Sequence, residues 1–183
     1  RYMKKWTKFI AAVVGVMALS GCLVPENFTA SVSVDGDGSY SYKYAGKTVF
    51  IPALLEMKKT GAALSPKAEK ELQDNVGKIA KSTDVQKASY IGNGRYDISI
   101  AGVRKPGQTA NVLDAFRVFT DKDGVLNITS VALKPSDKAE LAKLGLNING
   151  KLSVSLPKNA EVLSSNATSS PTFFGLFGTY SWA

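Results

Sequence analysis

The stretch that decides the fold is Phe28-Thr29-Ala30-Ser31-Val32-Ser33-Val34-Asp35-Gly36-Asp37-Gly38-Ser39-Tyr40-Ser41-Tyr42-Lys43-Tyr44. Apolar and polar residues alternate on both sides of its central Asp-Gly-Asp-Gly sequence. Alternation with a period of two is typical of a strand with one buried face, and glycine and aspartate favour tight turns. We therefore predict a β-hairpin from Phe28 to Tyr44, with Tyr40 and Tyr42 on the same face of its second strand as Tyr44.

The sequence beyond this hairpin predicts further turns and two helices. Gly92-Asn93-Gly94 and 121–124 are turn sequences between alternating segments. A serine followed by proline at Ser65-Pro66 is typical of a helix start, and apolar residues then recur at helical spacing to about Lys81. A shorter helix is expected from Ser136 to Leu144, and residues 52–59 also have helical character.

The C-terminal part of the chain predicts the remaining strands. Residues 151–156 and 160–164 have strand character, and the aromatic segment 172–182 is expected to form a closing strand. Hairpins separated by two helices predict a single α+β domain over residues 28–183, with a mainly antiparallel sheet.

The N-terminal segment has the features of a lipoprotein signal peptide. Basic residues precede the apolar run Phe9–Ala18, which is shorter than the roughly 20 residues that span a bilayer. It ends in Leu19-Ser20-Gly21-Cys22, which resembles the lipobox of bacterial lipoproteins. We predict a signal peptide over residues 1–21, cleavage between Gly21 and Cys22, and diacylglycerol and an acyl group such as palmitate on Cys22. The alternatives are an ordinary signal peptide, or a short buried helix, with a chance cysteine.

A lipid anchor at Cys22 predicts where the protein works. Residues 22–27 would be a short lipidated tether, and the domain would be extracytoplasmic. The residue after Cys22 is Leu23 rather than aspartate, which favours an outer membrane position facing the periplasm if the source is Gram-negative. Without residues 1–21 the net charge falls from +8 to +4, because four cations and no acidic residue lie there. This mildly basic surface does not predict a nucleic-acid partner.

The composition argues against an enzyme. The chain has no histidine and one cysteine, so Ser-His and Cys-His catalysis and a mature-chain disulfide are excluded. Asp35, Asp37 and Ser39 have the opening spacing of a calcium loop, but Gly46 stands where that loop needs a bidentate acid. We therefore predict no catalytic residue, no metal site and no cofactor apart from the covalent acyl groups.

Two groups of aromatic residues form a candidate binding surface. Aromatic rings give a large contact area, and tyrosine and tryptophan add a polar group, so the surface would suit a lipid or an envelope protein. The alternative is that these rings complete the core. The candidate residues are Tyr40, Tyr42, Tyr44, Phe173, Phe174, Phe177 and Trp182.

The order of these pieces resembles the LppM-type bacterial lipoproteins. A lipobox cysteine is followed by a strand and the 34–39 hairpin sequence, then by a helix and further strands, Leu156-Pro157, Asn166 and Trp182. The resemblance implies a small α+β domain, with lipid or glycolipid binding in at least one branch. This chain departs from some relatives in lacking a C-terminal transmembrane helix.

These observations give three hypotheses for function. The first is a membrane-anchored, non-enzymatic envelope lipoprotein that binds lipid, glycolipid or an envelope protein. The second is a structural or assembly component that docks through residues 173–182. The third is an anchored hydrolase that uses Ser/Lys or carboxylate chemistry.

Overall fold

The computed structural model describes residues 23–113, 115–130, 135–146, 148–163, 165 and 180–182. The described elements are, in chain order, β1 (Leu23–Val34), β2 (Tyr40–Phe50), α2 (Ile51–Thr60), α3 (Pro66–Asp74), α4 (Val76–Ala80), β3 (Val85–Gly92), β4 (Arg95–Arg104), β5 (Ala110–Val112), β6 (Phe116–Thr120), β7 (Leu126–Ser130), α5 (Pro135–Lys143), β8 (Asn149–Ser155) and β9 (Tyr180–Trp182).

The strands form two sheets. The larger sheet has six strands in the order β3-β4-β2-β1-β8-β9, and the smaller has three in the order β5-β6-β7. The pairing of β1 with β8 is parallel and the other pairings are antiparallel. This arrangement confirms the predicted α+β class with a mainly antiparallel sheet.

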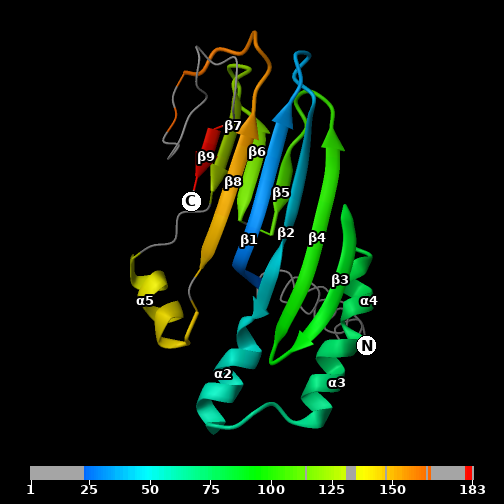
Figure 1. The fold of residues 1–183 in the computed structure, drawn as a ribbon, viewed down its shortest axis with the longest axis vertical. Coiled ribbons are helices and arrows are strands. Elements are labelled where there is room, and N and C mark those ends of the chain that lie inside the picture. Colours follow the sequence, from blue (N-terminus) through cyan, green and yellow to red (C-terminus); the bar gives the residue numbers. More distant parts are fainter. Residues whose placement is uncertain are drawn as a thin grey trace, which may run out of the picture.

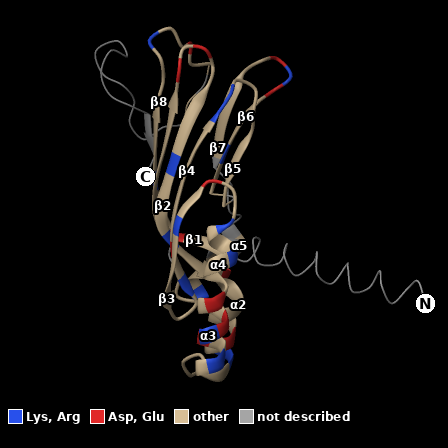
Figure 2. Cartoon of the chain, turned by 90° about the vertical axis from the view of Figure 1, so that its right-hand side faces the viewer, with Lys and Arg blue, Asp and Glu red and all other residues tan. Residues whose placement is uncertain are grey.

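The small sheet covers one face of the large sheet (Figures 1 and 2). Figure 2 shows β5, β6 and β7 on one side of β2, β4 and β8, while α2 and α3 lie at one end of the molecule. We call the face of the large sheet that points away from the small sheet the outer face. No helix among the described residues is long and apolar enough to cross a membrane.

The central hairpin forms as predicted, from β1 and β2. Val34 pairs with Tyr40 at its closed end. The Asp35 backbone N–H donates to the Ser39 carbonyl at 2.8 Å, and the Gly38 N–H donates to the Asp35 carbonyl at 3.0 Å. Gly38 has a φ of 88°, a left-handed conformation that glycine adopts without steric cost.

The strand β1 begins earlier than expected. Leu23 pairs with Phe50 and Pro25 pairs with Thr48, so the segment predicted as a tether after Cys22 is already part of the sheet. The register shifts between Pro25 and Asn27, which is the bulged position where a strand tolerates a proline that cannot donate a hydrogen bond. The prediction of a free tether over Leu23–Asn27 is therefore wrong, because alternation alone does not reveal pairing across a bulge.

The helices differ from the prediction in detail. Ser65 caps α3, since its Oγ accepts a hydrogen bond from the Ala68 N–H at 3.1 Å. The predicted single helix to Lys81 is divided into α3 and α4 at Asn75. The helical character of residues 52–59 is confirmed by α2. The segment 160–163 is not a strand, which corrects the expectation there.

The core fills the space between the sheets and the helices. Its largest fully buried side chains include Tyr40, Tyr44, Tyr96 and Phe116. A smaller cluster of Val49, Leu54 and Leu146 joins the end of β2 to α2 and to the residues after α5.

Candidate functional site

The three tyrosines of β2 do not form an exposed surface. Tyr40, Tyr42 and Tyr44 are 0%, 4% and 1% exposed, and they belong to the main core cluster. The Tyr40 hydroxyl donates to the Gln108 carbonyl at 2.6 Å, and the Tyr44 ring stacks on Phe28 with centroids 5.4 Å apart. Their predicted role as a binding surface is wrong, because their strand face lies under the small sheet and the helices. The alternative, that they complete the core, is correct.

The other predicted site residues lie outside what the structure describes. This holds for the lipidation and cleavage positions Gly21 and Cys22, and for Phe173, Phe174 and Phe177. The backbone of Trp182 lies in β9 opposite Leu152, but its side chain is not among the described ones. The lipid anchor and the aromatic C-terminal surface therefore stay predictions.

The outer face of the large sheet is the candidate site. Strand register places its residues in rows that run across the strands, because directly paired residues point to the same side. The rows are, from the hairpin turn downward, Val103-Ser41-Ser33-Ser155, then Ala101-Lys43-Ser31-Ser153, then Lys87-Ser99-Ala45-Thr29-Lys151, and finally Ser89-Asp97-Lys47-Asn27-Asn149.

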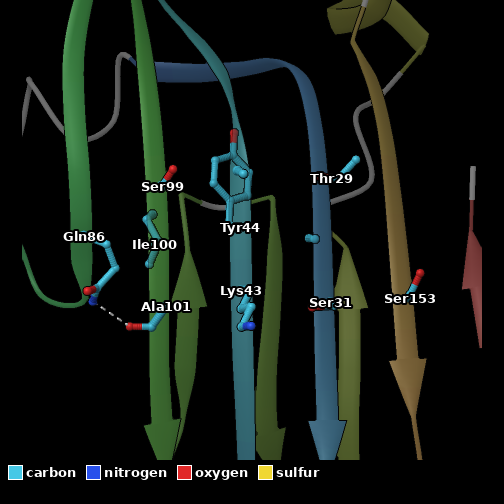
Figure 3. A pocket seen from close by; sticks show the side chains of 11 residues that line it. Thr29, Ser31, Lys43, Tyr44, Gln86, Ser99, Ile100, Ala101 and Ser153 are labelled. Carbon is cyan, nitrogen blue, oxygen red and sulfur yellow. Dashed lines mark hydrogen bonds between the residues drawn. The ribbon is translucent and has the colours of Figure 1, made fainter.

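The centre of this face carries small side chains. Thr29, Ser31 and Ala45 are exposed, whereas Ser99 and Ser153 are half-buried. They line a shallow depression of about 480 Å³ whose lining residues come from five neighbouring strands, β3, β4, β2, β1 and β8. Figure 3 shows the side chains of Thr29, Ser99 and Ser153 on the strands around it. A ligand can approach the strands closely here, because the outward-pointing residues of the two middle rows on β4, β2 and β1 are small apart from Lys43. Gln86 lies at the margin, where its side-chain amide donates to the Ala101 carbonyl at 3.2 Å.

The charges on the outer face are mostly positive. Lys43, Lys47, Lys87 and Lys151 are exposed on it, and the described acidic residue among the same rows is Asp97, the register partner of Lys47. The remaining polar groups are hydroxyls and amides. The face can therefore donate hydrogen bonds and attract anionic groups.

A polar cluster on the inner side of the large sheet ties the loop before β3 to β2 and β4. The Tyr42 hydroxyl donates to Asp84 Oδ2, and Arg104 Nη2 lies 2.6 Å from the same oxygen. The Arg104 guanidinium also lies over the Tyr42 ring, 5.3 Å from its centroid. A Cβ at Gly102 would come within 2.7 Å of both the Asp84 carboxylate and the Tyr42 hydroxyl, so the cluster requires glycine there.

This cluster shifts the pKa values of its members. The hydrogen bonds from Tyr42 and then from Arg104 lower the pKa of Asp84 below its usual 3.8. Burial, followed by the hydrogen bond to Asp84, raises the pKa of Tyr42 to about 12. Asp84 is thus an anion and Tyr42 a neutral donor at neutral pH, which suits a structural tie between the α4–β3 loop and the sheet.

The outer face presents hydroxyl, amide and ammonium groups. Among the described residues, no group of three His, Cys, Asp or Glu side chains is placed to hold a metal ion. A second open depression of about 510 Å³ is lined by Val103, Arg104, Gln108 and Thr109, but its guanidinium is already engaged by Asp84.

The signal for the outer face was present in the sequence. The polar positions of the β1 pattern, Thr29, Ser31 and Ser33, alternate with the buried positions. Their small size set them apart from the longer charged residues that usually solvate a sheet. The aromatic residues were predicted as the binding surface instead, because aromatic rings often serve binding. Their apolar positions in the alternation, however, predict burial.

Comparison with known proteins gives no relative for this chain. No model of a known protein family, no curated protein and no solved structure matches it. The resemblance to LppM-type lipoproteins therefore stays a prediction from the motifs.

Proposed function

We propose that the chain is a lipid-anchored, non-enzymatic protein of a bacterial cell envelope that binds its ligand on the outer face of the large sheet. The lipobox at Leu19–Cys22 supports the anchor, and the lack of histidine argues against hydrolase chemistry. The proposed location is extracytoplasmic, on the outer membrane and facing the periplasm if the cell is Gram-negative.

The observation that carries this proposal is the open outer face. One face of an antiparallel sheet often faces water, and long charged side chains usually cover such a face. Here the two middle rows carry serine, threonine and alanine on β4, β2 and β1, apart from Lys43, and further lysines stand only at the two ends of one row. A flat surface of small polar groups favours contact with a partner that can lie against the strands.

The proposed ligand is polar rather than an acyl chain. The inner face is filled by buried side chains such as Tyr44, Val32 and Tyr96. The depression on the outer face is shallow, and hydroxyls, Lys43 and Gln86 line it together with small alanines. Of the ligands expected from the sequence, a glycolipid headgroup or a polar envelope partner fits this surface better than a lipid tail.

Site-specific photo-crosslinking in cells tests the proposal. A photoreactive phenylalanine analogue at Ser31 should capture an envelope component. The matched control carries the same analogue at the exposed Thr129 in β7, on the small sheet. Equal capture from both positions, or capture from neither, would reject the outer face as the binding surface.

The anchor has a separate test. The full chain should incorporate labelled palmitate and remain with the membrane fraction, and Cys22→Ser should lose both properties. If the variant kept the label, the lipobox interpretation would be wrong.

A further inference from the structure

The lysines of the outer face are spaced across the strands rather than clustered. Lys87 and Lys151 lie at opposite ends of one row, which runs from β3 through β4, β2 and β1 to β8. At about 4.8 Å between neighbouring strands, their backbones are on the order of 19 Å apart. A single small anion cannot contact both lysines at once.

A third cation lies between these two. Lys43 belongs to β2, the middle of the five strands, and stands in the next row toward the hairpin turn. Cations on β3, β2 and β8 therefore follow one line across the sheet. The acidic Asp97 lies away from that line, opposite Lys47 in the lower row.

Hydroxyl groups fill the intervals between these cations. Ser99 stands beside Lys87 in the row, Thr29 stands beside Lys151, and Ser31 stands beside Lys43. These hydroxyls both donate and accept hydrogen bonds. The spacing of about 4.8 Å between neighbouring strands is close to the length of one sugar residue in an extended polysaccharide, so successive sugars could each meet one strand.

We propose that the outer face binds a linear, hydroxylated polyanion, such as an acidic polysaccharide, laid across the strands from Lys87 past Lys43 to Lys151. The proposal rests on the proposed function and names its class of ligand. The three lysines pair with anionic groups along the polymer, and the serine and threonine hydroxyls bind its own hydroxyls. The small residues at the centre let the polymer lie close to the sheet.

Other polyanions fit the surface less well. Single-stranded nucleic acid is normally held by exposed aromatic rings that stack on its bases, and the rows of the outer face carry no aromatic residue among the described positions. An acidic peptide supplies the charge but lacks the repeating hydroxyls. Comparing the binding of an acidic peptide with that of an acidic polysaccharide therefore separates recognition of charge from recognition of hydroxyls.

Binding of fluorescently labelled oligogalacturonate to the full chain in neutral detergent micelles tests the proposal. We expect an anisotropy increase for chains long enough to span Lys87 to Lys151, and a much weaker response for the monomer, for neutral dextran and for polyglutamate of equal length. Binding should weaken as salt is added, because the attraction is partly electrostatic.

A triple variant locates the site. Lys43→Gln, Lys87→Gln and Lys151→Gln together should weaken oligogalacturonate binding by about tenfold or more, since each exposed ion pair contributes up to about 1 kcal/mol. The charge-matched control replaces Lys59, Lys67 and Lys81 with glutamine. These exposed residues lie in α2, in α3 and just after α4, so this control should bind as the parent does.

Several outcomes would overturn the proposal. Equal weakening by both triple variants would mean a general charge effect. Monomer binding as tight as polymer binding would exclude the extended mode, and preference for polyglutamate would indicate an acidic protein instead. If oligogalacturonate does not bind but the crosslinker at Ser31 captures an envelope component, the polyanion proposal is wrong and the proposed function stands. If neither oligogalacturonate binding nor capture at Ser31 is seen, both proposals are wrong.

Discussion

The hydroxyl of Tyr42 in β2 donates a hydrogen bond to the carboxylate of Asp84, which precedes β3. These residues are far apart in the sequence, with β4 between their strands. Asp84 has a φ of 64°, a left-handed conformation that aspartate and asparagine tolerate better than other non-glycine residues. The bond to Tyr42 and the ion pair with Arg104 hold the loop in this conformation.

Replacing Asp84 with asparagine should destabilise the fold. Asparagine tolerates the backbone conformation, so the change mainly removes the charge that Arg104 and Tyr42 satisfy. We expect a loss of about 1–3 kcal/mol in the free energy of unfolding, measured by urea denaturation. Asp97→Asn, at an exposed position, is the control and should change it by less than about 0.5 kcal/mol. Equal effects would show that the Asp84 cluster contributes nothing particular.

The same cluster predicts a pH dependence with two limits. The pKa of Asp84 is lowered in the folded state, so its contribution is fully present above 3.8 and is lost as the pH falls through the lower folded value. The pKa of Tyr42 is raised from 10.0 to about 12. Its contribution is present below pH 10 and is lost as the pH rises from 10 to 12.

Denaturation across this range checks both limits. In Tyr42→Phe the alkaline loss of stability should be smaller than in the parent, although Tyr90 and Tyr96, whose pKa values also rise to about 12, should still contribute. In Asp84→Asn the acid loss should be smaller. If Asp84→Asn lost as much stability at low pH as the parent, other carboxylates would be the cause of that loss.

The hairpin and the helix caps were predictable because their causes are local. Gly36 and Gly38 supply a turn, and Ser65 with Pro66 supplies a helix start, whatever the rest of the chain does. The extension of β1 to Leu23 depends instead on pairing with Phe50. The local pattern of residue types does not reveal this long-range contact, and Pro25 argues against a strand at this position.

The candidate site was less predictable for a related reason. Alternation identified the two faces of β1 and β2, but it could not show which other strands join them. The line from Lys87 to Lys151 exists only because β3 and β8 occupy opposite flanks of the hairpin. The order of strands in a sheet is set by tertiary packing, and the sequence positions of the two lysines carry no sign of it.

Glycine at position 150 should be required by the ring of Phe28. Gly150 pairs with Phe28, and a Cβ there would overlap three atoms of that ring. Gly150→Ala should lower the free energy of unfolding by about 1–3 kcal/mol. A smaller cost in a Phe28→Ala background would identify the ring as the cause, as measured by a double-mutant cycle.

A second glycine provides the control for this change. A Cβ at Gly77, in α4, meets no atom within 4 Å, so Gly77→Ala should stabilise the protein by about 0.5–1 kcal/mol. Equal costs at positions 77 and 150 would contradict the steric explanation.

The buried tyrosines should respond differently to loss of their hydroxyls. Among the described residues, the Tyr44 hydroxyl is buried without a hydrogen-bond partner, whereas Tyr96 donates to the Leu72 carbonyl at 2.7 Å. An unpaired buried hydroxyl destabilises the fold. Tyr44→Phe should therefore leave the free energy of unfolding unchanged or raise it by up to about 1 kcal/mol, while the stacking on Phe28 is kept.

Tyr96→Phe leaves the Leu72 carbonyl without that partner and should lower the free energy of unfolding by about 1 kcal/mol. Urea denaturation of the two variants compares them directly, and a larger loss in Tyr44→Phe than in Tyr96→Phe would show that the Tyr44 hydroxyl has a partner after all.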